Sequence, residues 1–163
     1  MREPALPSVL FVCLGNICRS PLAQAALEMR AASLNLPMSI DSAGTGDWHI
    51  GRPPDPRALA EAERHGLDIS HYRARQIESA DFTRFTHVFA LDRQNLADIR
   101  TIAPEDAPAR IAMLLDLVAG QEGQDVIDPY FGDASGFSET WKQVSLAADA
   151  LIARMVSGSG ASA

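Results

Sequence analysis

A short apolar run near the start of the chain leads directly into a loop that contains a cysteine and an arginine. The run, residues 8–12, consists mostly of β-formers and is typical of a buried parallel strand. The loop, residues 13–20, ends before Pro21, a residue that the first turn of a helix tolerates. Apolar residues then recur at helical spacing, which predicts a helix over about 20–34. This strand–loop–helix unit constrains the fold more than any other feature.

The rest of the chain continues the alternation of strands and helices. Strands are expected at 38–40, 86–91 and 109–114, and helices at 57–65, 93–100 and from about 138 onward. Such alternation is typical of a parallel sheet covered on both faces. We therefore predict an α/β fold with a four-stranded parallel sheet, flavodoxin-like and doubly wound in the order 2-1-3-4, with helices on both faces. Ligands of such sheets bind beyond the carboxyl ends of the strands, where the loop at 13–20 lies.

Length and charge limit the class of protein. With 163 residues the chain corresponds to a single domain, expected over 1–156, and residues 157–163 are expected to form a flexible C-terminal tail. The formal net charge of −7 argues against a broad basic face, so neither nucleic acid nor an anionic membrane is an expected partner. Because no exposed heptad seam is apparent, we expect a monomer.

The two cysteines and the N-terminal region indicate the cellular compartment in which the protein works. Cys13 and Cys18 lie five residues apart, whereas a secreted disulfide scaffold uses more cysteines along the chain. No apolar run reaches the ~18 residues of a membrane span. A cleavable signal is disfavoured because Asn16 and Arg19 stand where such a signal is neutral and small. We therefore expect a cytoplasmic protein.

The residue types in the loop point to an oxyanion site. Backbone amides between a strand end and a helix start converge on one point and, with the helix dipole, form an anion cradle. Gly15 and Asn16 tolerate the positive φ that a wrapped loop requires, and Arg19 supplies a planar fork for two phosphate oxygens. In this positive field Cys13 favours its thiolate form, which can attack phosphorus in line.

Each loop residue on its own also has an ordinary interpretation. A cysteine at a strand end is commonly a small core residue, and an arginine near a helix start is commonly a solvated surface charge. The combination of an apolar strand, Gly15-Asn16, Ser20-Pro21 and a following helix favours a phosphate or similar oxyanion site.

The run from Val9 to Pro21 closely resembles the phosphate-binding loop of the low-molecular-weight protein tyrosine phosphatases. Further matching segments follow in the family's order, namely residues 41–45, 65–67, 70–71 with 75–76, and Asp128-Pro129-Tyr130-Phe131-Gly132. The resemblance implies a protein-tyrosine-phosphatase that hydrolyses phosphotyrosine and aryl phosphates without a metal or other cofactor. A phosphotyrosine-containing protein would be its substrate.

The resemblance also implies the catalytic roles. Cys13 would form a phosphocysteine intermediate, and Arg19 would bind phosphate together with the loop residues Leu14, Gly15, Asn16, Ile17, Cys18 and Ser20. Asp128 would act as general acid toward the departing phenolate and then as general base toward water, a role typically worth ~10²–10⁴ in rate. Without the loop, Asp128 would be interpreted as a surface turn residue, because Asp-Pro is a common turn pair.

Other positions resemble supporting residues of the family. Asn16, Ser42 and His71 would hold the loop in shape, although Ser42 and His71 also fit ordinary loop positions. Ser20 would hydrogen-bond the sulfur of the nucleophile, and Asp92 would orient Arg19 or Asp128.

Aromatic residues resemble the substrate rim of the family. Trp48, Tyr130 and Phe131 would grip the phenyl ring of the substrate, with Leu14 and Ile17 adding apolar contact. Trp48 also fits the role of an anchor for its own loop. Phe131 stands where the family often has a second tyrosine. A deep slot of this kind leaves the shorter phosphoserine unable to reach Cys13.

Cys18 lies in the same loop as the expected nucleophile, which suggests a redox-sensitive pair. A sulfenic acid formed on Cys13 by peroxide would be captured by Cys18 as a disulfide. The alternative is a cysteine that only packs against the helix.

The same residues bear on three other possible functions. Arsenate reductases resemble this loop but relay oxidation through further cysteines, and none follows Cys18. Phosphatases with a histidine before the nucleophile are excluded because Val12 precedes Cys13. A non-enzymatic phosphotyrosine- or phosphate-binding module needs neither a thiol nor a general acid. The four histidines show no ligand spacing with the cysteines, so no metal is expected.

Overall fold

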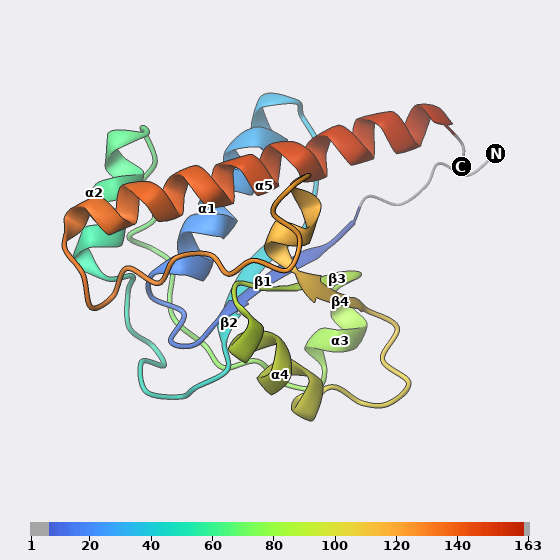
Figure 1. Ribbon diagram of the computed structural model, residues 1–163, viewed down its shortest axis with the longest axis horizontal. Coiled ribbons are helices and arrows are strands. Elements are labelled where there is room, and N and C mark those ends of the chain that lie inside the picture. The colour runs from blue at the N-terminus through green and yellow to red at the C-terminus, as the bar shows by residue number, and fades with distance from the viewer. Residues whose placement is uncertain (1–6, 162–163) are drawn as a thin grey trace.

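The computed structural model describes residues 7–161, with side chains over 7–156. Four parallel strands form one sheet in the order β2-β1-β3-β4. The strands are β1 (Val9–Cys13), β2 (Ile40–Gly44), β3 (His87–Ala90) and β4 (Arg110–Met113). The α/β class, the strand order and the helices on both faces that the sequence predicts are confirmed (Figure 1).

The register places the carboxyl ends of the strands at one edge of the sheet. In the centre, β1 pairs with β2 from Val9 to Cys13 and with β3 from Val9 to Val12. β2 lies on one side of β1, and β3 lies on the other side. The strand order therefore reverses its direction at β1. The loop after β1 therefore begins at the switch point, where ligands of doubly wound sheets bind.

Helices cover the sheet on both faces (Figure 1). On one face lie α1 (Arg19–Ser33) and α5 (Ala134–Ala161), with α2 (Pro56–Arg64) packed against them. The other face carries α3 (Asp81–Arg84) and α4 (Arg93–Ile102), and a short 3-10 helix, η1 (Leu114–Leu117), follows β4. Within residues 7–161, none of the helices combines the length and apolarity that crossing a membrane requires.

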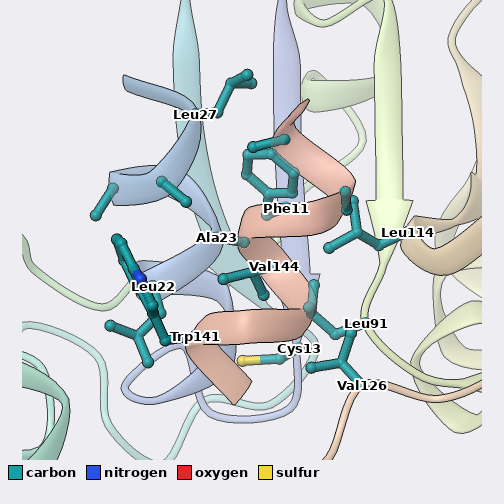
Figure 2. Close-up of a cluster of buried hydrophobic side chains, with 14 of the residues drawn as sticks. Phe11, Cys13, Leu22, Ala23, Leu27, Leu91, Leu114, Val126, Trp141 and Val144 are labelled. Carbon is teal, nitrogen blue, oxygen red and sulfur yellow. The ribbon is translucent and has the colours of Figure 1, made fainter. Parts of the chain in front are cut away.

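The side chains of β1 alternate between two hydrophobic clusters, as the period of a strand dictates. Phe11 and Cys13 lie in the cluster beneath α1 and α5, and Figure 2 shows them with Leu22 of α1 and Val144 of α5. Leu10 and Val12 point to the opposite face and join a second cluster with residues of α3 and α4. Because both faces are buried, this strand is apolar at every position.

The structure differs from the sequence prediction at the ends of the last helix. Instead of beginning near residue 138, α5 begins at Ala134, where an Asp133 carboxylate oxygen accepts a hydrogen bond from the Ser135 amide. The helix continues through Ala161 and so includes part of the tail expected at 157–163, whose flexibility stays a prediction; residues 162–163 lie outside the described residues. Once a helix is packed, each further residue adds a hydrogen bond without a new nucleation cost. The short α3 and η1 offer too few residues for a periodic pattern.

Candidate active site

A cavity of about 380 Å³ opens at the carboxyl edge of the sheet. It brings together the loop after β1, the segment after β2, and the connection between η1 and α5. The residues that line it are Cys13, Leu14, Gly15, Ile17, Cys18, Arg19, Trp48, His49, Asp128, Tyr130 and Phe131. Most of the predicted site residues therefore meet in one place, although Asp128 lies far from the loop in sequence.

The sulfur of Cys13 lies at the floor of this cavity. Cys13 is the last residue of β1 and is only 2% exposed. The backbone amide of Asn16 donates a hydrogen bond to the sulfur at 3.3 Å, and the Ser20 hydroxyl lies 3.0 Å from it. When the sulfur is ionised, the hydroxyl can only donate. Both groups are therefore hydrogen-bond donors toward a thiolate at this position.

The shape of the loop depends on Asn16. This residue is 3% exposed and has a φ of 59°, a conformation that asparagine tolerates better than most residues. Its side-chain amide donates to the hydroxyls of Ser20 at 2.8 Å and Ser42 at 3.0 Å, and its carbonyl oxygen accepts from the Arg75 amide at 3.0 Å. The Ser42 hydroxyl in turn donates to Gln24 at 2.7 Å. These bonds fasten the loop to β2 and α1.

Arg19 begins α1 and is almost fully buried beneath the loop. Its guanidinium donates to Asp92 at 2.7 Å and lies 3.5 Å from the carboxylate of Asp128. Burial by itself lowers the pKa of Arg19, but the neighbouring Cys13, Asp92 and Asp128 outweigh burial and raise it, so the cation persists. The second oxygen of Asp92 accepts from the Asn95 amide at 2.7 Å and caps α4, which holds the carboxylate in place.

Asp128 follows a segment that is anchored to the sheet and to α5. The Val126 amide donates to the carbonyl of Leu91 at 2.8 Å, and the Ile127 carbonyl accepts from the hydroxyl of Thr140 at 2.9 Å. Beyond this anchor the side chain of Asp128 is 43% exposed, and one of its oxygens accepts from the Tyr130 amide at 3.1 Å. The carboxylate therefore stands at the mouth of the cavity with access to water.

Aromatic side chains form the rim, as the resemblance implies. Trp48 is 66% exposed and Phe131 is 93% exposed, while the ring of Tyr130 meets that of Phe131 edge to face. His49, which was not predicted as a site residue, also lines the cavity, and its ring lies 2.9 Å from where a Cβ on Gly15 would stand. Because His49 lies in an irregular segment, no periodic pattern in the sequence identifies it as a site residue.

The structure does not bring His71 to the loop. His71 is exposed, and its ring packs edge-on against Tyr72 at a centroid distance of 4.9 Å. Across residues 7–161 no hydrogen bond joins it to the loop, where Gln24 and the Arg75 backbone instead complete the polar network. His71 lies in a turn, which the hydrogen bond from the Tyr72 amide to the Ile69 carbonyl closes. The sequence does not reveal which way a side chain in such an irregular turn points.

Cys18 and Cys13 are both free thiols. Burial, together with the nearby carboxylate of Asp55, raises the pKa of the Cys18 thiol far above its ordinary value. Cys18 is therefore uncharged at neutral pH and packs in the core, and its capture of an oxidised Cys13 stays a prediction. In the part of the chain that the structure describes, no group of three or more His, Cys, Asp or Glu side chains is placed to hold a metal ion.

Known proteins are similar to this chain in fold and in sequence. A family model described as low molecular weight phosphotyrosine protein phosphatase matches residues 8–158. The phosphatase of that description from Schizosaccharomyces pombe is 40% identical over 139 residues, which are 83% of this chain and 88% of that protein. The crystal structure of YfkJ from Bacillus subtilis has a TM-score of 0.87 at 35% identity, covering 96% of this chain and 98% of the other. A Drosophila arginine phosphatase has a TM-score of 0.86 at 31% identity, with coverages of 91% and 97%.

The fold and these similarities define a phosphatase, a hydrolase of phosphate esters and related bonds. The chain belongs to the low molecular weight phosphotyrosine protein phosphatase family. The resemblance carried by the loop is thereby confirmed, and so is the enzyme class. Family membership favours hydrolysis over the alternatives of an arsenate reductase and a non-enzymatic binding module.

Proposed function

We propose that this phosphatase hydrolyses phosphotyrosine in proteins through a phosphocysteine on Cys13, with Asp128 as general acid and base. One observation carries the proposal. A buried sulfur with two hydrogen-bond donors, the buried guanidinium of Arg19 and an accessible carboxylate share a single cavity, with the carboxylate 3.5 Å from the guanidinium.

In the first step the Cys13 thiolate attacks phosphorus. The sulfur–phosphorus bond forms while the bond from phosphorus to the phenolic oxygen breaks. The protonated carboxyl of Asp128 gives its proton to that oxygen, so tyrosine leaves as a neutral phenol. The loop amides and Arg19 face the phosphoryl oxygens and stabilise the charge that they carry in the transition state.

In the second step water releases the phosphate. Asp128, now a carboxylate, takes a proton from water as the oxygen attacks phosphorus. The sulfur–phosphorus bond breaks and Cys13 leaves as a thiolate. The hydroxyl of Ser20, 3.0 Å from the sulfur, stabilises this leaving group.

The depth of the cavity supports selection for an aromatic phosphate. Cys13 is buried at the floor, whereas Trp48, Tyr130 and Phe131 stand at the rim. We therefore expect a phosphotyrosine ring to contact these aromatic side chains while its phosphoryl group reaches Cys13, and the shorter side chain of phosphoserine to lack that reach.

The experiment compares the parent with Cys13→Ser and Asp128→Asn on 4-nitrophenyl phosphate and on phenyl phosphate, with EDTA present, at about pH 5.5. We expect no turnover from Cys13→Ser and a loss of ~10²-fold or more from Asp128→Asn on phenyl phosphate, which has a poorer leaving group. Asp125→Asn is the matched control, because Asp125 is exposed in the same segment and, among the residues described, pairs with Arg93 alone. Turnover by Cys13→Ser would refute the covalent route.

Substrate class is tested with three phosphopeptides of otherwise equal sequence. Phosphotyrosine is expected to be hydrolysed at least ~10-fold faster than phosphoserine, because only its ring reaches from rim to floor. Phosphoarginine is included because a structural relative is an arginine phosphatase. Preference for phosphoarginine would overturn the proposed substrate while leaving the role of Cys13 intact.

We also infer a cytoplasmic monomer. Two free thiols fit a reducing compartment. Sedimentation at several concentrations and fractionation of the native cells test these two statements.

A further inference from the structure

Arg57, in the first turn of α2, contacts the segment that carries Asp128. Its guanidinium donates one hydrogen bond to the carbonyl of Gly132 and another to the carbonyl of Tyr130, each at 3.0 Å. The same group lies over the ring of Phe137 at 4.8 Å and over the ring of Tyr130 at 5.8 Å. Arg57 therefore holds the chain on the C-terminal side of Asp128 by two carbonyls and an aromatic ring.

The orientation of this arginine is set by Asp55. The Nε and Nη2 atoms of Arg57 donate to the two carboxylate oxygens of Asp55, both at 3.0 Å, which is the bidentate geometry that best fixes a guanidinium. The Arg57 amide donates to the same carboxylate at 2.8 Å, so Asp55 also caps α2. Hydrogen bonds from Arg57 hold the pKa of Asp55 below its ordinary value, which keeps the pair ionised.

Asp55 connects this pair to the phosphate-binding loop. Its backbone amide donates to the carbonyl of Ile17 at 2.8 Å, and Ile17 lies between the expected nucleophile and Arg19. A continuous path of hydrogen bonds thus runs from Ile17 through Asp55 and Arg57 to Tyr130 and Gly132. The path joins the phosphate-binding loop to the segment that carries Asp128. The distance between these two segments decides whether the Asp128 carboxyl reaches the leaving group.

Among the residues described, Pro129 is the buried part of the acid segment on this side, where it lies beside Gly136. Asp128, Phe131 and Gly132 are exposed, so burial of apolar surface contributes little to the position of these three residues. On the N-terminal side Ile127 is held by Thr140 and by Gln143, whose side-chain oxygen accepts from the Ile127 amide at 2.8 Å. Asp128 therefore stands between two anchors, and Arg57 provides the second one.

We propose that Arg57, oriented by Asp55, is a positioning residue that sets the distance of the Asp128 carboxyl from the phosphate-binding loop and so governs protonation of the leaving group. The inference rests on the proposed role of Asp128 as general acid. Misplacement of a reacting group by about 1 Å can cost ~10²-fold in rate, so the loss of one anchor is expected to be large.

The test measures kcat/KM for aryl phosphates whose leaving groups differ in basicity. This parameter reports the steps up to the first irreversible one, here the attack that releases the phenol, and excludes the later hydrolysis. In Arg57→Ala we expect a loss of ~10-fold or more for phenyl phosphate, whose leaving group needs a proton. For 2,4-dinitrophenyl phosphate, whose leaving group departs without one, the loss is expected to stay within ~2-fold. The slope of log kcat/KM against leaving-group pKa therefore becomes steeper.

Two variants serve as comparisons. Arg52→Ala removes the same charge from the connection just before α2, and Arg52 is exposed with no side-chain hydrogen bond or ion pair among the residues described. We expect its slope to equal that of the parent. Arg57→Lys keeps the charge but lacks the planar fork, so its slope is expected to lie between those of the parent and Arg57→Ala.

The double variant Arg57→Ala, Asp128→Asn separates positioning from a general effect on folding. If Arg57 acts through Asp128, the double variant hydrolyses phenyl phosphate as slowly as Asp128→Asn alone. The inhibition constant of inorganic phosphate is expected to be unchanged in Arg57→Ala, because the phosphate-binding loop stays intact.

Equal losses on both aryl phosphates, or additive losses in the double variant, would overturn the positioning role. If Asp128→Asn itself leaves the leaving-group slope unchanged, the proposed general acid is wrong instead. The two failures are therefore distinguishable.

Discussion

Asn16 and Asn35 offer a paired test of what holds the phosphate-binding loop. Both asparagines have a positive φ, 59° at Asn16 and 54° at Asn35. Asn16 is buried at the centre of a polar network, whereas Asn35 is exposed just after α1. Substitution at Asn35 therefore reports the cost of the backbone conformation alone, and substitution at Asn16 reports that cost together with the network.

The expected magnitudes follow from the hydrogen bonds. The Asn16 side chain makes three, to Ser20, Ser42 and the Arg75 amide, each worth ~1 kcal/mol of unfolding free energy. Alanine at positive φ costs a further ~1 kcal/mol, which glycine does not incur. We expect losses of ~3 kcal/mol for Asn16→Gly and ~4 kcal/mol for Asn16→Ala. At Asn35 the corresponding losses are ~0 and ~1 kcal/mol.

Urea unfolding of the four variants, followed by circular dichroism, gives these differences. Because small domains unfold at about 5–15 kcal/mol, most of the protein is expected to stay folded in each variant. Hydrolysis of 4-nitrophenyl phosphate is expected to fall in both Asn16 variants and to be unchanged in both Asn35 variants. If Asn16→Gly were no less stable than Asn35→Gly, the side-chain network would not be what holds the loop.

Three further predictions concern other parts of the molecule. Gly44→Ala should abolish hydrolysis, because its Cβ would lie 2.7 Å from the backbone oxygen of Leu14 and displace the loop; a rate within ~2-fold of the parent would contradict this. Burial alone raises the pKa of Glu61, but hydrogen bonds from three neighbours outweigh burial and lower that pKa. The stability that the Glu61 carboxylate contributes is therefore present above pH 4.5 and is lost as the pH falls through the pKa of Glu61 in the folded protein. Glu61→Gln should therefore flatten the fall of urea-unfolding free energy below that pH. Trp48→Ala should raise KM for a phosphotyrosine peptide while the inhibition constant of phosphate stays unchanged.

Local chemistry in the sequence was sufficient to predict the strand, the loop and the helix of residues 9–33. The continuous apolar run of β1 and the helical spacing of α1 are properties of neighbouring residues, and they appear in the structure with ends shifted by a residue or so. The loop after β1 lies where the strand order switches. This position could be predicted because short, right-handed connections leave a parallel sheet few possible strand orders.

Contacts between distant segments required more than such patterns. Asp128 was singled out by family resemblance, since its Asp-Pro pair by itself indicates only a turn, and its place 3.5 Å from Arg19 depends on how the last connection crosses the sheet edge. The same resemblance suggested His71, which the structure leaves exposed while Gln24 and Arg75 complete the network.

The sequence by itself determined the elements of this protein and the chemistry of its loop, because helices, strands and anion-binding turns form from interactions within a few residues. Only the tertiary structure decided what stands opposite the loop. Arg57 illustrates the difference, since an arginine at the start of a helix is ordinary in the sequence. Its two hydrogen bonds to the carbonyls of Tyr130 and Gly132 exist because the start of α2 lies beside the connection before α5. Such a meeting is set by the packing of the whole chain, and no local pattern encodes it.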